Sequence, residues 1–271
     1  MDVRTYWTLV LVGSLSLSLV LVSSVSYSFL SSEQCLVSAL DESVDHEAFL
    51  TLVAEDAGSI LSTFVMMSDA NELASRLREA LSISWVRQQG RIVVSSFLDS
   101  IAGRGDLSGQ VSIVPLRHTL AAYLASSYPL PATYFEQLIP ATLPVSLFLN
   151  GSAVDSIRIR YTVLSYMRLM GMAILGTVGV MGYKRNKELP LSRALIHGGT
   201  LSCIGSFIGM MAIAAYIRST ADALGHASIS AYADTLASHY VGHVWPFMLL
   251  PLGVSVVGLA CHARRRPDVT A

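Results

Sequence analysis

The stretch YWTLVLVGSLSLSLVLVSSVSYSFL at residues 6–30 contains no charged side chain. A helix of about 20 apolar residues is long enough to cross the hydrocarbon core of a bilayer. Three further stretches have the same apolar character, at about residues 163–183, 194–217 and 244–261. The sequence therefore predicts an all-α membrane protein with about four transmembrane helices.

The composition of the whole chain supports this prediction. Of its 271 residues, 52% are hydrophobic and only 14% are charged, whereas a soluble domain has about 25% charged residues. Proteins that bind nucleic acid present a basic face, and basic residues are clustered here only in short segments next to the predicted spans. We therefore expect the lipid bilayer, and no nucleic acid, as a partner.

The first apolar stretch has two interpretations. Ser24-Val25-Ser26 has the small-x-small pattern of a signal-peptide cleavage site. The stretch is, however, long for a signal peptide, and Arg4 is the only basic side chain before it. These features favour an uncleaved N-terminal anchor helix over residues 1–30, with a cleaved signal peptide as the alternative.

Basic residues beside the spans predict the orientation in the membrane. The short loop at 184–193 contains four Lys or Arg residues and the C-terminal tail contains three, whereas the segment at 218–243 contains one Arg and two Asp. Lys and Arg are enriched in cytoplasmic loops. We therefore expect a protein of the cell membrane with cytoplasmic N and C termini, and with residues 31–160 and 218–243 on the other side.

The region at 31–160 is predicted to form a mostly helical extracytoplasmic domain. Its eight Arg and fourteen Asp or Glu give a net charge of −6. Apolar residues recur at helical spacing over most of it, while Val111 and Ile113 alternate with polar residues and predict one short strand. Four prolines between 129 and 144 predict an irregular stretch, and residues 161–271 then form a three-helix transmembrane region.

Small residues mark predicted faces of helix packing within the membrane. Gly176 and Gly179 lie in the second span, and Gly205 and Gly209 form a GxxxG pair in the third. Small side chains let transmembrane helices approach closely. We expect these faces to pack within the chain's own bundle, and the alternative is that they dock another membrane subunit or a second copy.

One short motif predicts a covalent modification. Asn150-Gly151-Ser152 is a sequon for N-glycosylation. The predicted orientation puts it on the extracytoplasmic side, so Asn150 is a possible glycosylation site.

The segment between the third and fourth spans carries the candidate metal ligands Asp222, His226, His239 and His243. Within each pair the spacing is four residues, which places both side chains on one face of a helix, as in metal-binding helices. Carboxylate and imidazole ligands suit transition metals such as zinc, copper or iron. The alternative interpretation is that these histidines lie at the membrane interface, where amphipathic rings are common.

The sequence contains no GxSxG, Walker or HExxH motif. We therefore expect a non-enzymatic membrane protein without a cofactor, acting as an accessory, structural or partner-binding subunit of a membrane or cell-surface assembly. One alternative is a metal-dependent enzyme or metal-handling protein. Another is an oligomeric channel or transporter that uses Arg168 and the serines of the first span.

Overall fold

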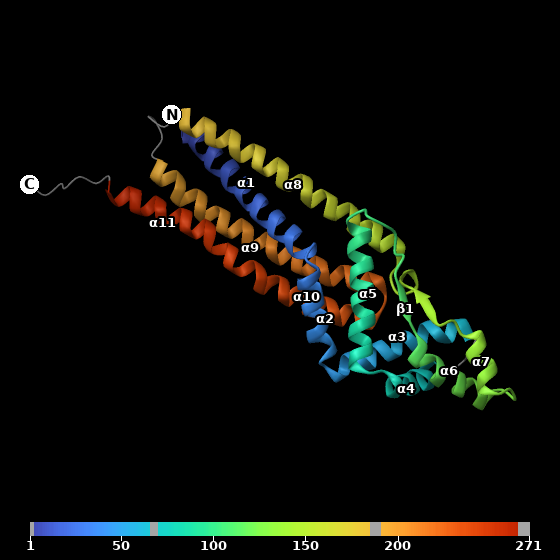
Figure 1. Cartoon of the computed structure of the whole chain (residues 1–271). Coiled ribbons are helices and arrows are strands. Elements are labelled where there is room, and N and C mark those ends of the chain that lie inside the picture. Colours follow the sequence, from blue (N-terminus) through green and yellow to red (C-terminus); the bar gives the residue numbers. More distant parts are fainter. Residues whose placement is uncertain (1–2, 66–69, 185–190, 265–271) are drawn as a thin grey trace, which may run out of the picture. The chain divides into compact units, whose positions relative to one another are not determined.

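The computed structural model describes residues 3–65, 70–184 and 191–264 (Figure 1). The described chain is mostly helical and also contains one small two-stranded sheet. Its elements are α1 (Val3–Leu30), α2 (Glu33–Val44), α3 (Glu47–Val65), α4 (Ala70–Ala80), α5 (Ile83–Ile101), β1 (Gln110–Ser112), α6 (Val114–Ser127), α7 (Ala132–Leu138), β2 (Thr142–Pro144), the 3-10 turn η1 (Val145–Leu147), α8 (Gly151–Lys184), α9 (Leu191–Leu224), α10 (Ala227–Val244), the 3-10 turn η2 (Trp245–Met248) and α11 (Leu249–Arg264).

The chain divides into two compact units, and four long helices run from one into the other. We call them the span unit (Met1–Phe29, Arg160–Ala215 and Tyr240–Ala271) and the domain unit (Leu30–Ile159 and Tyr216–His239).

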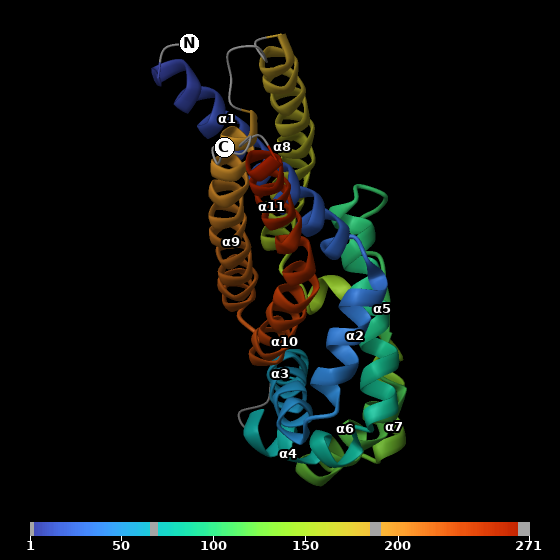
Figure 2. The same ribbon diagram turned by 90° about the vertical axis from the view of Figure 1, so that its left-hand side faces the viewer.

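Within the described residues, four helical stretches are long and apolar enough to cross a membrane, and this number agrees with the prediction. They are Arg4–Leu30, Gly151–Gly182, Ser192–Asp222 and Ala227–Ala263. The parts of the helices inside the span unit are 3–29, 160–184, 191–215 and 240–264, which are 27, 25, 25 and 25 residues long. At 1.5 Å per residue these parts are about 40 Å long, which matches a bilayer with its headgroup regions. Figures 1 and 2 show the helices of this unit side by side.

The second long helix begins earlier than hydropathy predicts, at Gly151 instead of about residue 163. Its first turn is capped, because the Asn150 side-chain oxygen accepts hydrogen bonds from the backbone nitrogen (3.0 Å) and hydroxyl (2.8 Å) of Ser152. Asn150 therefore has a structural role whether or not it is glycosylated, which stays a prediction.

Glycines allow α9 and α11 to approach each other closely. A Cβ atom added at Gly199 would lie 2.6 Å from the carbonyl oxygen of Pro251. One added at Gly258 would lie 2.9 Å from the backbone nitrogen of Ile196. Any side chain at these two positions would push the helix backbones apart, so this contact depends on glycine.

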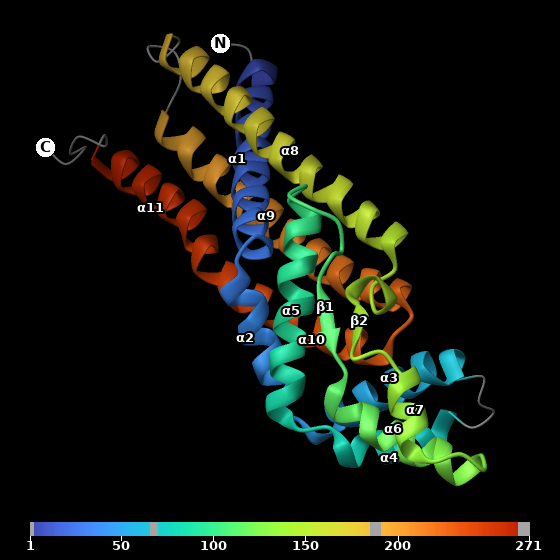
Figure 3. The same ribbon diagram turned by 45° about the vertical axis from the view of Figure 1, so that its right-hand side comes forward.

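The domain unit is built from helices with well-defined ends. Ser32 and Ser82 are the N-caps of α2 and α5, and their side chains accept hydrogen bonds from the backbone nitrogens of Cys35 and Trp85. The α5 helix ends at Ile101, and the chain turns away two residues later at Gly103, whose φ of +70° suits glycine. Figure 3 shows β1 beside β2, and the strands pair antiparallel. The mostly helical prediction for this region is confirmed, but its proline-rich stretch also holds the short helix α7 and the strand β2.

Helices α2 and α5 are joined by an apolar contact and by ion pairs. Leu40 lies against Gly90, where an added Cβ would come within 2.6 Å of a Leu40 methyl carbon. Asp41 is paired with Arg91 at 3.1 Å and also with Arg87. These side chains are partly exposed, so the ion pairs add little stability and mainly hold the register of the two helices.

Candidate functional site

The domain unit contains an apolar cavity of about 290 Å³. Its wall is formed by helices α2, α3 and α5, by Val111 of β1, and by the parts of the four long helices that belong to this unit. Leu, Ile, Val, Phe and Ala side chains make up most of the lining. Two small residues of the wall, Ala221 and Ala233, leave room for the cavity where larger side chains would fill it.

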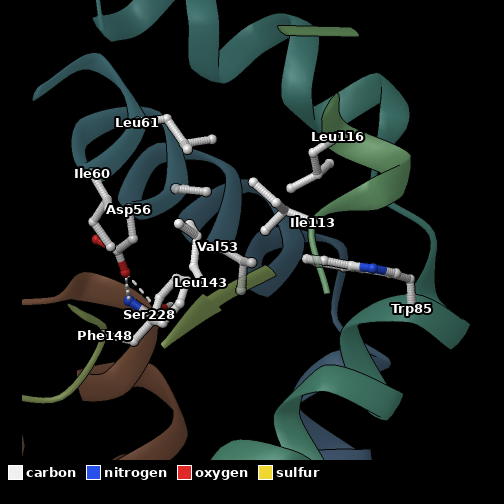
Figure 4. A pocket seen from close by; sticks show the side chains of 11 residues that line it. Val53, Asp56, Ile60, Leu61, Trp85, Ile113, Leu116, Leu143, Phe148 and Ser228 are labelled. Atoms are coloured by element: carbon white, nitrogen blue, oxygen red, sulfur yellow. Dashed lines mark hydrogen bonds between the residues drawn. The ribbon is translucent and has the colours of Figure 1, made fainter. Parts of the chain in front are cut away.

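A smaller cavity of about 80 Å³ lies beside the larger one. The two have six lining residues in common: Val53, Asp56, Ile60, Trp85, Phe148 and Ser228. Figure 4 shows the Trp85 ring on one side of the smaller cavity and the Asp56–Ser228 pair on the other. The shared walls make the two cavities one apolar site.

Asp56 caps the start of α10 at the edge of this site. Its carboxylate accepts hydrogen bonds from the backbone nitrogens of Ser228 (2.9 Å) and Ala227 (3.3 Å), and from the Ser228 hydroxyl. His226 Nδ1 lies 3.7 Å from the same carboxylate. A negative charge at a helix N-terminus is favourable, so the Asp56 carboxylate stabilises the start of α10.

Three other polar lining residues also have partners within the protein. The Tyr232 hydroxyl donates to the Leu36 carbonyl oxygen at 3.0 Å. Gln89 Oε1 accepts from the Ser112 backbone nitrogen at 2.7 Å, and Trp85 Nε1 donates to the Ser112 carbonyl oxygen at 3.0 Å. The surface offered to a ligand is therefore mainly hydrocarbon.

The predicted metal ligands lie in different surroundings. Asp222 is exposed at the end of α9, His226 is next to Asp56, and His239 is hydrogen-bonded to Glu42 of α2. The remaining histidine, His243, lies between two aromatic rings of the span unit, those of Phe29 and Phe247. Within the described ranges, no group of three or more His, Cys, Asp or Glu side chains is placed to hold a metal ion.

Gly205 and Gly209 of α9 both face α1. A Cβ added at Gly205 would lie 2.7 Å from the Ser18 hydroxyl oxygen, and one at Gly209 would lie 3.0 Å from a methyl carbon of Val22. These two glycines therefore lie at a close helix contact inside the span unit.

Gly176 and Gly179 of α8 lie in a different environment, because a Cβ added at either would meet nothing within 4 Å. Only 6% of the most apolar window of α8 is buried, compared with 28–33% in the other three candidate spans. This helix therefore exposes most of its apolar surface.

The polar groups named for a channel have partners inside the span unit. The Ser18 hydroxyl donates to the Ser202 carbonyl oxygen at 2.9 Å, and the hydroxyls of Ser26 and Tyr240 are 2.7 Å apart. The Arg168 guanidinium carbon lies 4.9 Å from the centre of the Tyr27 ring, a cation–π geometry. The two serines thus join α1 to other helices.

Sequence reasoning did not predict the apolar cavity, because its wall comes from segments far apart in the chain. Comparison with known proteins adds no family to this picture: no protein-family model, no curated protein and no solved structure matches the chain.

Proposed function

We propose that this chain is a non-enzymatic, multi-pass protein of the cell membrane whose domain unit binds an apolar ligand. The observation that carries the proposal is the apolar cavity of about 290 Å³. Ligand pockets are typically about 300–1,000 Å³, and an engineered apolar cavity of about 150 Å³ is large enough to bind benzene. The cavity is therefore large enough for a small apolar molecule.

The apolar lining also supports a ligand. Apolar surface left in contact with water is unfavourable by about 25 cal/mol per Å². A ligand that fills the cavity removes this surface from water and is held by contacts with the hydrocarbon side chains of the wall.

The proposal includes the orientation expected from the sequence. The basic loop at 184–193 and the basic tail are cytoplasmic, and the domain unit is extracytoplasmic. The distribution of basic residues supports this orientation, since the loop at 184–193 has four Lys or Arg and the tail three, whereas the segment at 218–243 has one.

Native mass spectrometry of gently extracted protein tests the proposal. The wild-type protein should carry a bound apolar molecule. An Ala233→Phe variant, in which the added ring occupies the cavity, should lose it. A Ser238→Phe variant is the matched control, because it adds the same ring on an exposed position of the same helix.

The same measurement can contradict the proposal in two ways. Wild-type protein without any bound molecule, or equal occupancy in wild type and Ala233→Phe, would overturn binding in the cavity. A bound transition metal that is lost when His239 and His243 are both replaced by Ala would favour the metal-dependent alternative.

A second candidate function is that of a subunit in a membrane assembly, which the exposure of α8 favours. Gly176 and Gly179 form an open, small-residue strip on a helix whose most apolar window is only 6% buried. Small residues allow another transmembrane helix to pack closely. The partner would be a second copy of this chain or another membrane subunit.

Co-purification distinguishes this candidate from simple exposure to lipid. Replacing Gly176 and Gly179 by Leu should abolish recovery of a stoichiometric partner. Gly198→Leu is the control, because Gly198 also has nothing within 4 Å but lies on α9. A monomeric wild-type protein that recovers no partner would rule this candidate out.

A further inference from the structure

We infer that the occupant of the cavity is a single hydrocarbon chain of a membrane lipid, entering from the bilayer. This inference rests on the proposed function and specifies its ligand class. Three features of the cavity support it: where its wall begins along the helices, its extent, and the chemistry of its lining.

Some lining residues lie at or near the sequence positions where the helices pass from the span unit into the domain unit. Leu30, Ile157 and Tyr216 all line the cavity. Leu30 and Tyr216 are the first residues of the domain unit after α1 and α9 leave the span unit, and Ile157 is three residues before Arg160 of α8. The helices that carry these residues, α1, α8 and α9, continue without a break from the span unit into the domain unit, so we expect a chain from the bilayer to follow their surfaces.

The lining is extended along two helices. On α9 it runs from Tyr216 to Leu224, and on α5 from Val86 to Phe97. At 1.5 Å per residue these runs are about 12 Å and about 16 Å long. The volume of about 290 Å³ is twice that of a cavity that binds benzene, which leaves room for roughly a dozen carbon atoms. An extended cavity of this capacity suits one acyl chain.

The chemistry of the lining selects a ligand portion without polar groups. The Asp56 carboxylate and Gln89 Oε1 accept hydrogen bonds from backbone nitrogens, and the Tyr232 hydroxyl donates one to the Leu36 carbonyl oxygen. A polar group brought into an apolar site without a hydrogen-bond partner is destabilised, because it loses its hydrogen bonds to water. We therefore expect the headgroup of the lipid to stay outside the cavity.

Photo-cross-linking of the full chain in phosphatidylcholine nanodiscs tests the inference. The probe is phosphatidylcholine with a diazirine at the end of one acyl chain. We expect labelled peptides from α5 and α3, which are not among the candidate spans. Labelling of these helices should fall to background in Ala233→Phe and persist in Ser238→Phe.

Labelling restricted to the four span helices, or equal labelling of α5 in wild type and Ala233→Phe, would overturn the inference. Native mass spectrometry separates this failure from failure of the proposed function. If the wild-type protein carries an apolar molecule that is not a lipid and that Ala233→Phe loses, cavity binding stands and the acyl-chain inference fails. If no molecule is bound and no label reaches α5, both fail.

Discussion

Filling the cavity with one side chain should stabilise the ligand-free protein. Ala233 of α10 lines the cavity, whereas Ala237, one turn further on, is fully buried and is not part of its lining. A phenyl ring therefore has room at the first position and none at the second. Filling a cavity raises the free energy of unfolding by about 0.5–2 kcal/mol, while overpacking lowers it by about 1–3 kcal/mol.

The assay is thermal unfolding of lipid-stripped protein in detergent, followed by the helical circular dichroism signal. For a chain of about this size, 1 kcal/mol shifts the melting temperature by about 2–4 °C. Ala233→Phe should melt above wild type and Ala237→Phe below it. Saturating ligand, at about 100 times its Kd, should add about 2.7 kcal/mol to wild type and nothing to Ala233→Phe, so their order should reverse. Equal destabilisation by both substitutions would refute the existence of free space at Ala233.

Three further predictions concern packing, capping and hydrogen bonding. Gly199→Ala should lower the melting temperature, because its Cβ would lie 2.6 Å from a carbonyl oxygen of α11. Gly176→Ala is the control and should leave the melting temperature unchanged or slightly raised. Equal melting temperatures of the two variants would contradict the close approach of α9 and α11. Asp56→Ala removes the side-chain acceptor at the start of α10 and should lower the free energy of unfolding by about 1 kcal/mol; an unchanged melting temperature would show that this cap contributes nothing. Tyr240→Phe removes the hydrogen bond to Ser26 and should lower the free energy of unfolding by about 0.6–1.5 kcal/mol. A double-mutant cycle with Ser26→Ala should give a coupling energy of similar size. Strictly additive effects of the two substitutions would argue against the hydrogen bond.

The number of long helices could be predicted from the sequence because it depends on local hydropathy. An uncharged run such as residues 6–30 has few structural alternatives to a membrane helix. The ends of these helices were less predictable. Asp155 and Arg158 lower the hydropathy before the second span, yet helix propensity and the Asn150 cap extend α8 back to Gly151.

The site could not be predicted because it is made by contacts between distant residues. Asp56 and Ser228 are 172 positions apart in the chain, and no local pattern pairs them. The neighbours of the histidines could not be predicted from their spacing either. His226 and His239 contact Asp56 and Glu42, which helical spacing within one segment does not reveal.

The indole of Trp85 gives the native chain a spectroscopic sensor of the cavity. Its ring lines both cavities, and its Nε1–H bond to the Ser112 carbonyl fixes its orientation. Indole emission shifts to shorter wavelength as its surroundings lose water. The other two tryptophans, Trp7 and Trp245, belong to the span unit and can be replaced by Phe. The emission wavelength of Trp85 then reports whether water or hydrocarbon fills the site, without any attached dye.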